Sequence, residues 1–457
     1  MPSLIQDGMF IDGLQYAAIS KNLAHHLGTF WFPYLSENWN RQGSIYFLEH
    51  PPLVYAIQSI FFRILGDSIY TERIYCLFTA GISALLMIKI WNLVSKNDPE
   101  TTRLSWLPIL LWIMTPLVFR SYQMNVQENT MGIFLLAAIY CILKAMNIHR
   151  YSYYYMVLAG VSVFLSSLCK GVPGLFPIVA VGIYWVAGGK VKFTKMLSHS
   201  LVLVIVPAIF YSLLLLNDNA YASLSFYFTE RLLERVQNDP VVNSHLWSIF
   251  KLFIDLLPAI LICFIAFLAG RKETSFVDIK EYKRNVIFFL LVGVAGSVPL
   301  SFTLVQRGFY LSPSLPYFAI ALALLAAPFL NTILKKFSQK STGFMLMRTL
   351  SILLLIGGLV YTGLQVGKSE RDQDILHDMY IMGKEIGENS RVQLTASSGD
   401  HWRLELYLIR HYNISLDFSS KEYEYLIRKK SNELQLQESY TLIPLQTETY
   451  NLYKKSD

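Results

Sequence analysis

The sequence contains little charge for its length. Only 16% of its 457 residues are Asp, Glu, Lys or Arg, 53% are hydrophobic, and the mean hydropathy is +0.39. Soluble domains usually carry about 25% charged residues, so an ordinary soluble enzyme is excluded. The net charge of +7 does not indicate nucleic-acid binding, because membrane proteins concentrate Lys and Arg in cytoplasmic loops. We expect a polytopic protein whose surroundings are a lipid bilayer, with no nucleic-acid partner.

Three other features are scarce or missing. The four cysteines show no CxxC spacing, so we assign them neither a disulfide nor a metal. No glycine-rich phosphate loop is present, which leaves no visible machinery for a reaction driven by a cytosolic nucleotide. The start, MPSLIQDGMFIDG, lacks the basic and apolar regions of a cleavable signal peptide.

Long apolar segments are abundant, and ten are candidates for crossing about 30 Å of hydrocarbon. These candidates are residues 70–95, 103–120, 127–147, 153–169, 172–188, 196–216, 246–270, 285–305, 310–332 and 345–366. Residues 51–66, PPLVYAIQSIFFRILG, are too short to span comfortably and contain Arg63. We expect a re-entrant or interfacial helix there.

The loops between these segments alternate in charge. Every second loop is basic, and the positive-inside rule assigns those loops to the cytoplasm. Residues 1–69, the loop 217–245 and the tail from residue 367 then lie outside, so we expect a multi-pass inner-membrane protein with an extracytoplasmic site. Because no predicted span precedes residues 1–69, this orientation favours an additional upstream helix over translocation without a signal.

The pattern changes after the last span. Residues 367–457 contain a polar helix, the strand-like VQLTAS, the amphipathic HWRLELYLIRHY and a further short strand. We predict an all-α membrane domain over residues 1–366, whose first outer loop, 1–69, carries interfacial helices. A small extracytoplasmic α/β domain follows over residues 367–457.

Ionisable residues gather at the predicted outer face, where proximity to lipid makes them candidates for function. The residues are Asp7, Asp12, Glu49, His50, Glu128, Lys170 and Arg307, with Tyr310 close by. Each has a simpler explanation: Asp12 could cap a helix, Lys170 could extend toward headgroups, and Tyr310 could be an interfacial anchor. Glu128 could form a structural ion pair with Arg120 or Lys170. Their common location on one side favours a shared role.

The chemistry of these side chains indicates one class of substrate. Carboxylates can act as a general base on a hydroxyl or hold a divalent metal ion. Lys170, Arg307 and a protonated His50 can bind a phosphate or diphosphate leaving group. A sugar carried on a polyprenyl phosphate has both the phosphate and the long apolar tail that this arrangement fits.

Several stretches resemble the lipid-linked-sugar-dependent glycosyltransferases of the GT-C superfamily, of the protein O-mannosyltransferase and lipid A aminoarabinose transferase type. The resemblance covers residues 1–330. It rests on the stretches DGLQYAAISKNLAHHLGTFWFPYL, YFLEHPPLVYAIQSIFFRILGDSIYTERI, VQENTMGIFLLAAIY, CKGVPGLFP and RGFYLSPSLPYFAIALA, in that order.

The resemblance implies roles for the outer residues. Asp12 matches the catalytic aspartate of the first loop, and Glu49 and Glu128 match further acidic positions that could bind a metal. Lys170 and Arg307 match positions expected to contact the lipid phosphate, and Tyr310 lies beside them. His50 stands where lysine is usual in the family.

The sequence departs from the family pattern at the start of the first loop. The usual Asp-Glu pair is Asp12-Gly13 here, with Asp7 as a candidate replacement for the second carboxylate, and Gln15 stands where arginine is common.

We predict a membrane glycosyltransferase that moves a sugar from a polyprenyl-phosphate donor to an extracytoplasmic acceptor, a glycolipid, glycan or protein hydroxyl. Two alternatives remain open. A secondary transporter or lipid flippase would have ionisable residues at the bilayer midplane and inverted repeats. A glycan polymerase would act on diphosphate-linked oligosaccharides. Within 217–245, SLSFYFTERLLERV predicts an amphipathic helix that lines a substrate groove or lies at the interface.

Overall fold

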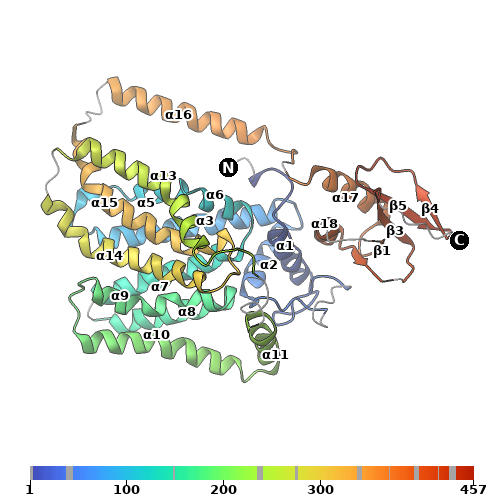
Figure 1. The fold of residues 1–457 in the computed structure, drawn as a ribbon, viewed down its shortest axis with the longest axis horizontal. Helices are drawn as coiled ribbons and strands as arrows, with labels where there is room; N and C mark the ends of the chain where they lie inside the picture. The colour runs from blue at the N-terminus through green and yellow to red at the C-terminus, as the bar shows by residue number, and fades with distance from the viewer. Residues whose placement is uncertain are drawn as a thin grey trace.

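The chain forms a long helical bundle with a small sheet-containing unit at one end (Figure 1). The structure is a computed structural model, and it describes residues 4–37, 45–147, 150–233, 240–272, 276–336, 342–369, 371–395, 401–419, 421–431 and 439–456.

Within the described residues, eight helices are long and apolar enough to cross a membrane. They are α3 (Thr71–Val94), α7 (Gln127–Asn147), α8 (Ser152–Lys170), α10 (Phe193–Leu214), α13 (Trp247–Gly270), α14 (Phe276–Ser297), α15 (Leu315–Lys336) and α16 (Thr342–Gly363). The 3₁₀ turn η4 (Val298–Phe302) follows α14, and η5 (Gly308–Ser314) leads into α15. The predicted fold class, a helical membrane protein with a small C-terminal α/β part, is confirmed.

Two of the ten predicted spans are broken rather than continuous. Residues 103–120 form α5 (Trp106–Ile113) and α6 (Pro116–Gln123), with the short α4 (Pro99–Thr102) before them. The break falls at Thr115, which is extended with ψ 116°, because a residue before proline avoids the helical region.

Residues 172–188 likewise form the 3₁₀ helix η2 (Val172–Val179) followed by α9 (Ala180–Val186). Pro173 and Pro177 lie in η2, and neither has an amide hydrogen to donate to a regular helix. Apolar composition alone predicts membrane burial but not helix continuity.

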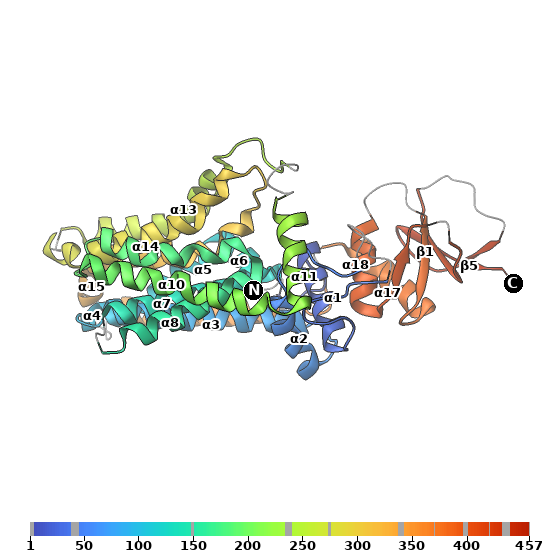
Figure 2. The ribbon, with the colours of Figure 1, turned by 90° about the horizontal axis from the view of Figure 1, so that it is seen from below.

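Two shorter helices lie at the end of the bundle that faces the sheet unit: α1 (Ile11–Ala24) and α2 (Leu53–Leu65). With 13 residues, α2 is too short to span, and it buries one face that includes Tyr55 and Phe62. At the same end of the bundle, α11 (Asp218–Phe226) continues into the π-helical turn η3 (Tyr227–Leu233) (Figure 2). The last three residues of the predicted amphipathic segment, 234–236, lie outside the described residues.

The basic loops gather at the opposite end of the bundle. There, the Lys335 ammonium contacts the Glu100 carboxylate at 2.7 Å, and the Tyr282 hydroxyl donates to Asp98, also at 2.7 Å. The separation of basic loops from α1 and α2 follows the charge alternation read from the sequence.

The C-terminal unit is a mixed five-stranded sheet with two helices. The strand order is β2-β1-β3-β5-β4; β1 pairs in parallel with β2 and β3, and β5 pairs antiparallel with β3 and β4. The elements are α17 (Gln373–Ile386), β1 (Arg391–Thr395), α18 (Trp402–Tyr412), β2 (Ser415–Asp417), β3 (Tyr425–Lys429), β4 (Tyr440–Ile443) and β5 (Tyr450–Lys455).

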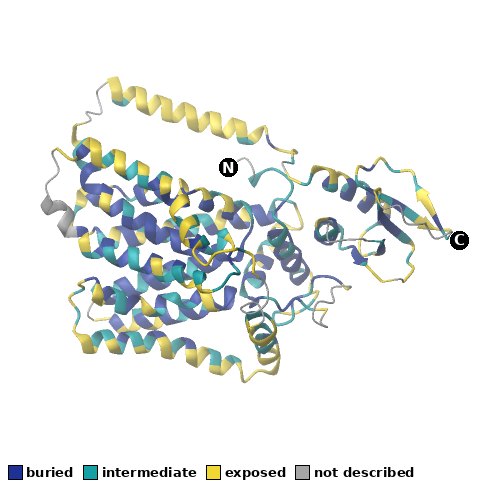
Figure 3. Ribbon diagram, viewed as in Figure 1, coloured by how far each residue is buried: buried dark blue, intermediate teal, exposed yellow. Residues whose placement is uncertain are grey.

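Two large clusters of buried apolar residues organise the molecule. One fills the bundle between α3, α7, α14 and α15. The other joins α1 and α2 to the C-terminal unit: Ile19 and Tyr55 belong to the same cluster as Leu408 and Val392. In contrast, α16 is exposed along almost its whole length (Figure 3), as expected for a helix surrounded by lipid.

Candidate functional site

The first turn of α1 carries Asp12 and packs tightly against the turn that precedes α7. Gly13 has no side chain to separate the two segments, and a Cβ there would lie 2.9 Å from the carbonyl carbon of Met124 and closer still to its oxygen. The Asn125 amide donates to the Gly13 carbonyl at 2.9 Å. The departure from the family's Asp-Glu pair therefore has a steric cause, because this packing leaves no room for a glutamate.

Two buried tyrosines, Tyr16 and Tyr55, lie among the predicted site residues. The rings of Tyr16 and Tyr55 have centroids 5.9 Å apart. Burial raises the pKa of Tyr16 well above its usual range, and the nearby charges of Asp12 and Glu128 raise it further. Burial also raises the pKa of Tyr55, and the charges of Glu49 and Asp12 raise it further. A hydrogen bond from the Gln127 amide lowers the pKa of Tyr55 in part.

Glu128 and Lys170 form a buried ion pair at 2.5 Å. Glu128 begins α7 and Lys170 ends α8, so antiparallel packing of the two helices brings the residues together at the α1 end. Their side chains are 1% and 9% exposed, which means that each charge depends on the other for compensation.

Buried polar atoms without partners surround this ion pair. Among the described residues, the second carboxylate oxygen of Glu128 makes no hydrogen bond, and neither do the side-chain oxygen of Gln127 and the amide of Asn129. Such atoms are costly to bury. Water or a substrate would satisfy them.

An aromatic pair from η5 covers Lys170. Its ammonium lies 4.9 Å from the Tyr310 ring centroid and 5.4 Å from that of Phe309, distances at which the cation attracts the rings. Arg307 lies three residues before Tyr310, is exposed, and forms no ion pair with any other described residue. Arg307 thus belongs to the edge of the site.

Glu49 and His50 approach the site from the loop before α2. The His50 ring nitrogen Nε2 lies 3.4 Å from the Tyr16 hydroxyl, and His50 is buried. Glu49 forms an ion pair with Arg231 of η3, which ties the loop to the segment after α11. Tyr227 of η3 also donates to the Lys170 carbonyl at 3.3 Å.

Asp7 does not occupy the position of the missing second carboxylate. Its side chain accepts hydrogen bonds from the Tyr380 hydroxyl at 2.6 Å and from the Gly8 amide at 2.7 Å. These partners attach Asp7 to the C-terminal unit, so the suggested replacement of the lost carboxylate by Asp7 has no structural basis.

The donor set does not fit the suggested divalent metal. In the part of the chain that the structure describes, no group of three or more His, Cys, Asp or Glu residues is placed to hold an ion. Glu49 and Glu128, the suggested ligands, are each paired with a cation. We therefore assign no step to a metal.

Three further residues near this site were not among the predicted ones. Arg231 pairs with Glu49, and Lys251 pairs with Asp255 one turn further along α13. The Lys251 side chain approaches Gly308, next to Arg307. Lys251 and Asp255 could have been predicted, because they are two charges four residues apart inside an apolar span. The sequence around Arg231 contains no comparable pattern.

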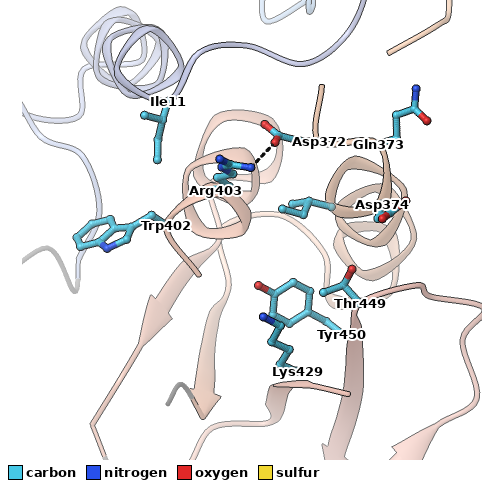
Figure 4. Close-up of a pocket in the computed structure, with 10 residues that line it drawn as sticks. Ile11, Asp372, Gln373, Asp374, Trp402, Arg403, Lys429, Thr449 and Tyr450 are labelled. Carbon is cyan, nitrogen blue, oxygen red and sulfur yellow. Dashed lines mark hydrogen bonds and ion pairs between the residues drawn. The ribbon is translucent and has the colours of Figure 1, made fainter. Parts of the chain in front are cut away.

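A polar cavity of about 700 Å³ lies between α1 and the C-terminal unit (Figure 4). Ile11, the neighbour of Asp12, lines one side, and Trp402, Lys429 and the ion pair of Arg403 with Asp372 line others. The cavity thus combines an aromatic ring with charged groups next to the first turn of α1.

Comparisons with known proteins give one family match and several fold matches. Residues 49–215 match the family described as dolichyl-phosphate-mannose-protein mannosyltransferase. No curated protein sequence matches the chain.

The fold comparison covers nearly the entire chain. The crystal structure of ArnT from Cupriavidus metallidurans bound to undecaprenyl phosphate superimposes with a TM-score of 0.67 at 14% identity, covering 99% of this chain and 95% of that one. The apo state of ArnT gives 0.65 at 13% identity, covering 99% and 94%. The apo oligosaccharyltransferase of Archaeoglobus fulgidus gives 0.50 at 16% identity, covering 89% and 60%.

The chain is thus a multi-pass membrane protein with the ArnT fold and a mannosyltransferase-family segment. The resemblance read from the sequence agrees with both comparisons: residues 49–215 match the mannosyltransferase family model, and the fold of the whole chain is that of ArnT.

Proposed function

We propose that this protein transfers a sugar from a polyprenyl-phosphate carrier to a hydroxyl of an extracytoplasmic acceptor at the inner membrane. The binding of undecaprenyl phosphate by ArnT supports this class of donor. The basic loops at the far end of the bundle support an extracytoplasmic location for the α1 end.

The observation that carries the proposal is the buried ion pair of Glu128 with Lys170, at the end of the bundle where the first turn of α1 carries Asp12. Asp12 of α1 and Glu128 of α7 both act electrostatically on the buried Tyr16. Lys170 binds Glu128 directly. Carboxylates and a cation are therefore close together at one end of the bundle, as phosphate-linked sugar transfer requires.

In the proposed reaction, the acceptor oxygen bonds to the anomeric carbon of the sugar, and Asp12 takes the hydroxyl proton as general base. The bond between the anomeric carbon and the phosphate oxygen breaks, and polyprenyl phosphate leaves with the electron pair. Lys170 and Arg307 stabilise the negative charge on the leaving phosphate. Tyr310 covers Lys170 and lines the same position.

Glu128, Glu49 and His50 support these groups. Glu128 holds Lys170 in place, and the Glu49 ion pair with Arg231 fixes the loop before α2. His50, anchored near the Tyr16 hydroxyl, adds a donor for phosphate. The proposed route for the acceptor is the polar cavity, which Ile11 in the first turn of α1 lines.

The test is transfer of labelled sugar from a polyprenyl-phosphate donor in membranes. We expect Asp12→Asn to lower the rate by at least about a hundredfold, the lower range for loss of a general base, and Lys170→Met to lower it by at least about a hundredfold through lost stabilisation of the leaving phosphate. The ion pair of Lys335 with Glu100 supplies matched controls, because its side chains are 65% and 50% exposed at the other end of the bundle. Lys335→Met and Glu100→Gln should retain full transfer.

Removal of Lys170 alone leaves the buried Glu128 charge uncompensated, which could unfold the protein. The double variant Lys170→Met/Glu128→Gln removes both charges and keeps the test informative. It should elute as folded protein but remain inactive. Transfer at the wild-type rate by folded Asp12→Asn and by the double variant would refute the assignment.

A further inference from the structure

A second cavity, of about 460 Å³, opens beside the segment that leads into α1. Three arginines from separate elements line this arginine cavity: Arg73 at the start of α3, Arg120 near the end of α6, and Arg371 just before α17. Among the described residues, Asp7 is the one acidic residue that lines it. The described lining therefore carries three positive charges against one negative charge.

The charges of the described lining residues do not balance one another. The Asp7 carboxylate is already engaged by the Tyr380 hydroxyl at 2.6 Å. Arg73 is buried and donates to backbone carbonyls, including that of Gln123 at 2.9 Å. Arg120 and Arg371 are exposed and form no ion pair with another described residue. Two guanidinium groups thus remain available to an anion.

Close backbone packing holds Arg371 at the cavity. Gly8 has a φ of +84°, and a Cβ there would lie 2.7 Å from the Arg371 carbonyl oxygen. The Asp7 amide donates to the Lys368 carbonyl at 2.9 Å. The guanidinium of Arg371 then lies 5.9 Å from the Phe10 ring centroid, so the residue is held from its backbone and from its side chain.

The arginine cavity is separated from the proposed donor site by an aromatic wall. The Phe10 and Phe309 rings meet edge to face with centroids 5.7 Å apart. Arg371 lies against Phe10, while Lys170 lies against Phe309. Arg371 and Lys170 therefore lie against different rings, and the residues that line the arginine cavity do not include Lys170.

An unpartnered donor provides an independent indication of a ligand. Gln123 lines the cavity, and its buried side-chain amide nitrogen makes no hydrogen bond within the described part of the chain. A buried donor without an acceptor is costly. An anionic oxygen in the cavity would satisfy it.

We propose that the arginine cavity binds a phosphoryl group at the membrane surface, a function beyond the proposed sugar transfer. Arginine matches phosphate oxygens with paired donors, whereas an isolated carboxylate would leave part of the three-arginine lining unused. Arg73 and Arg120 belong to helix ends on the α1 side of the bundle, at the level where lipid headgroups lie. The phosphoryl group comes from a lipid headgroup or from free phosphate.

The experiment measures retention of radiolabelled dioctanoyl phosphatidic acid by the full chain in a neutral detergent, without sugar donor. The Arg307→Gln background removes a contribution from the proposed donor site. Into this background we introduce Arg120→Gln and Arg371→Gln together, since both side chains are exposed and their loss should not unfold the protein. Arg103→Gln, an exposed arginine at the opposite end of the bundle, is the matched control.

We expect the double substitution to weaken retention by about tenfold or more, the effect of losing two charge-assisted contacts, and Arg103→Gln to leave it unchanged. Competition by inorganic phosphate at similar concentration would identify free phosphate as sufficient; failure to compete would identify the lipid headgroup. Equal retention by the double variant, or equal retention of neutral dioctanoylglycerol, would overturn the proposal. Because no sugar is transferred in this assay, failure of the proposed enzymatic function would not affect its result.

Discussion

Replacement of Gly13 by alanine should be among the most damaging small changes in the chain. The new methyl group would overlap the Met124 carbonyl and lie 3.1 Å from the Asn125 side chain. A carbonyl cannot rotate away as a side chain would, so α1 or the turn before α7 must move. That movement would also stretch the hydrogen bond from the Asn125 amide to the Gly13 carbonyl, now 2.9 Å.

The cost can be estimated from two contributions. Overpacking in a rigid interior costs about 1–3 kcal/mol, and the upper end applies because the obstacle is backbone. Weakening one buried hydrogen bond adds about 1 kcal/mol, for a total of roughly 3–4 kcal/mol. Transfer should fall as well, because Asp12 is the adjacent residue.

The control is Gly81→Ala in α3, where a Cβ would meet nothing within 4 Å. Alanine in that helix should be neutral or stabilising by up to about 1 kcal/mol. The midpoint of thermal unfolding in detergent and the transfer rate in membranes would be compared. If Gly13→Ala matched Gly81→Ala in both measurements, or if Gly13→Glu increased transfer, the steric explanation for the missing glutamate would be refuted.

Three further predictions concern polar contacts outside the membrane spans. Burial lowers the pKa of Lys21 to about 8, so the unfolded chain holds more protons than the folded one between about pH 8 and its ordinary value of 10.5. Stability should therefore rise across that interval by roughly 3 kcal/mol, and thermal unfolding of Lys21→Met should lose this rise. Asp378→Asn should destabilise the C-terminal unit by about 2–3 kcal/mol, detected by proteolysis, because the buried carboxylate accepts three backbone amide hydrogens from residues 448–450. Arg231→Gln should slow sugar transfer about tenfold, the low end for a positioning contact, by releasing the Glu49 loop; an unchanged rate would contradict this role.

The membrane spans were readable because each is a long apolar run, and lipid imposes that composition on any helix that crosses it. Residues 103–120 and 172–188 have the same composition, yet both are broken at proline. The signals for the breaks, Pro116 and the pair Pro173 and Pro177, were present in the sequence. A hydropathy average over the whole segment does not detect single prolines, so it does not predict these breaks.

The sequence allowed two ion-pair partners for Glu128, Arg120 and Lys170. The pair with Lys170 was predictable because each of these charges stands alone at the end of an apolar run. The other predicted partner of Glu128, Arg120, instead lines the arginine cavity. Arg231 could not have been assigned to Glu49, since the two are far apart in sequence and neither local pattern names a partner. Asp7 is close to Asp12 in sequence, yet its side chain contacts Tyr380; chain proximity does not determine which neighbour a carboxylate faces.

The C-terminal unit fixes both ends of the helix that carries Asp12. Before α1, the Met9 amide donates to the Tyr407 hydroxyl at 3.0 Å. In its last turn, the Lys21 ammonium donates to the carbonyls of Ile409 and Arg410, in the last turn of α18, at 3.0 and 2.8 Å. These contacts add to the packing of α1 against the turn before α7, and they tie both ends of the helix to the C-terminal unit. The sheet-containing unit therefore influences the proposed chemistry through the position of α1, since its described contacts reach α1 and the segment before it.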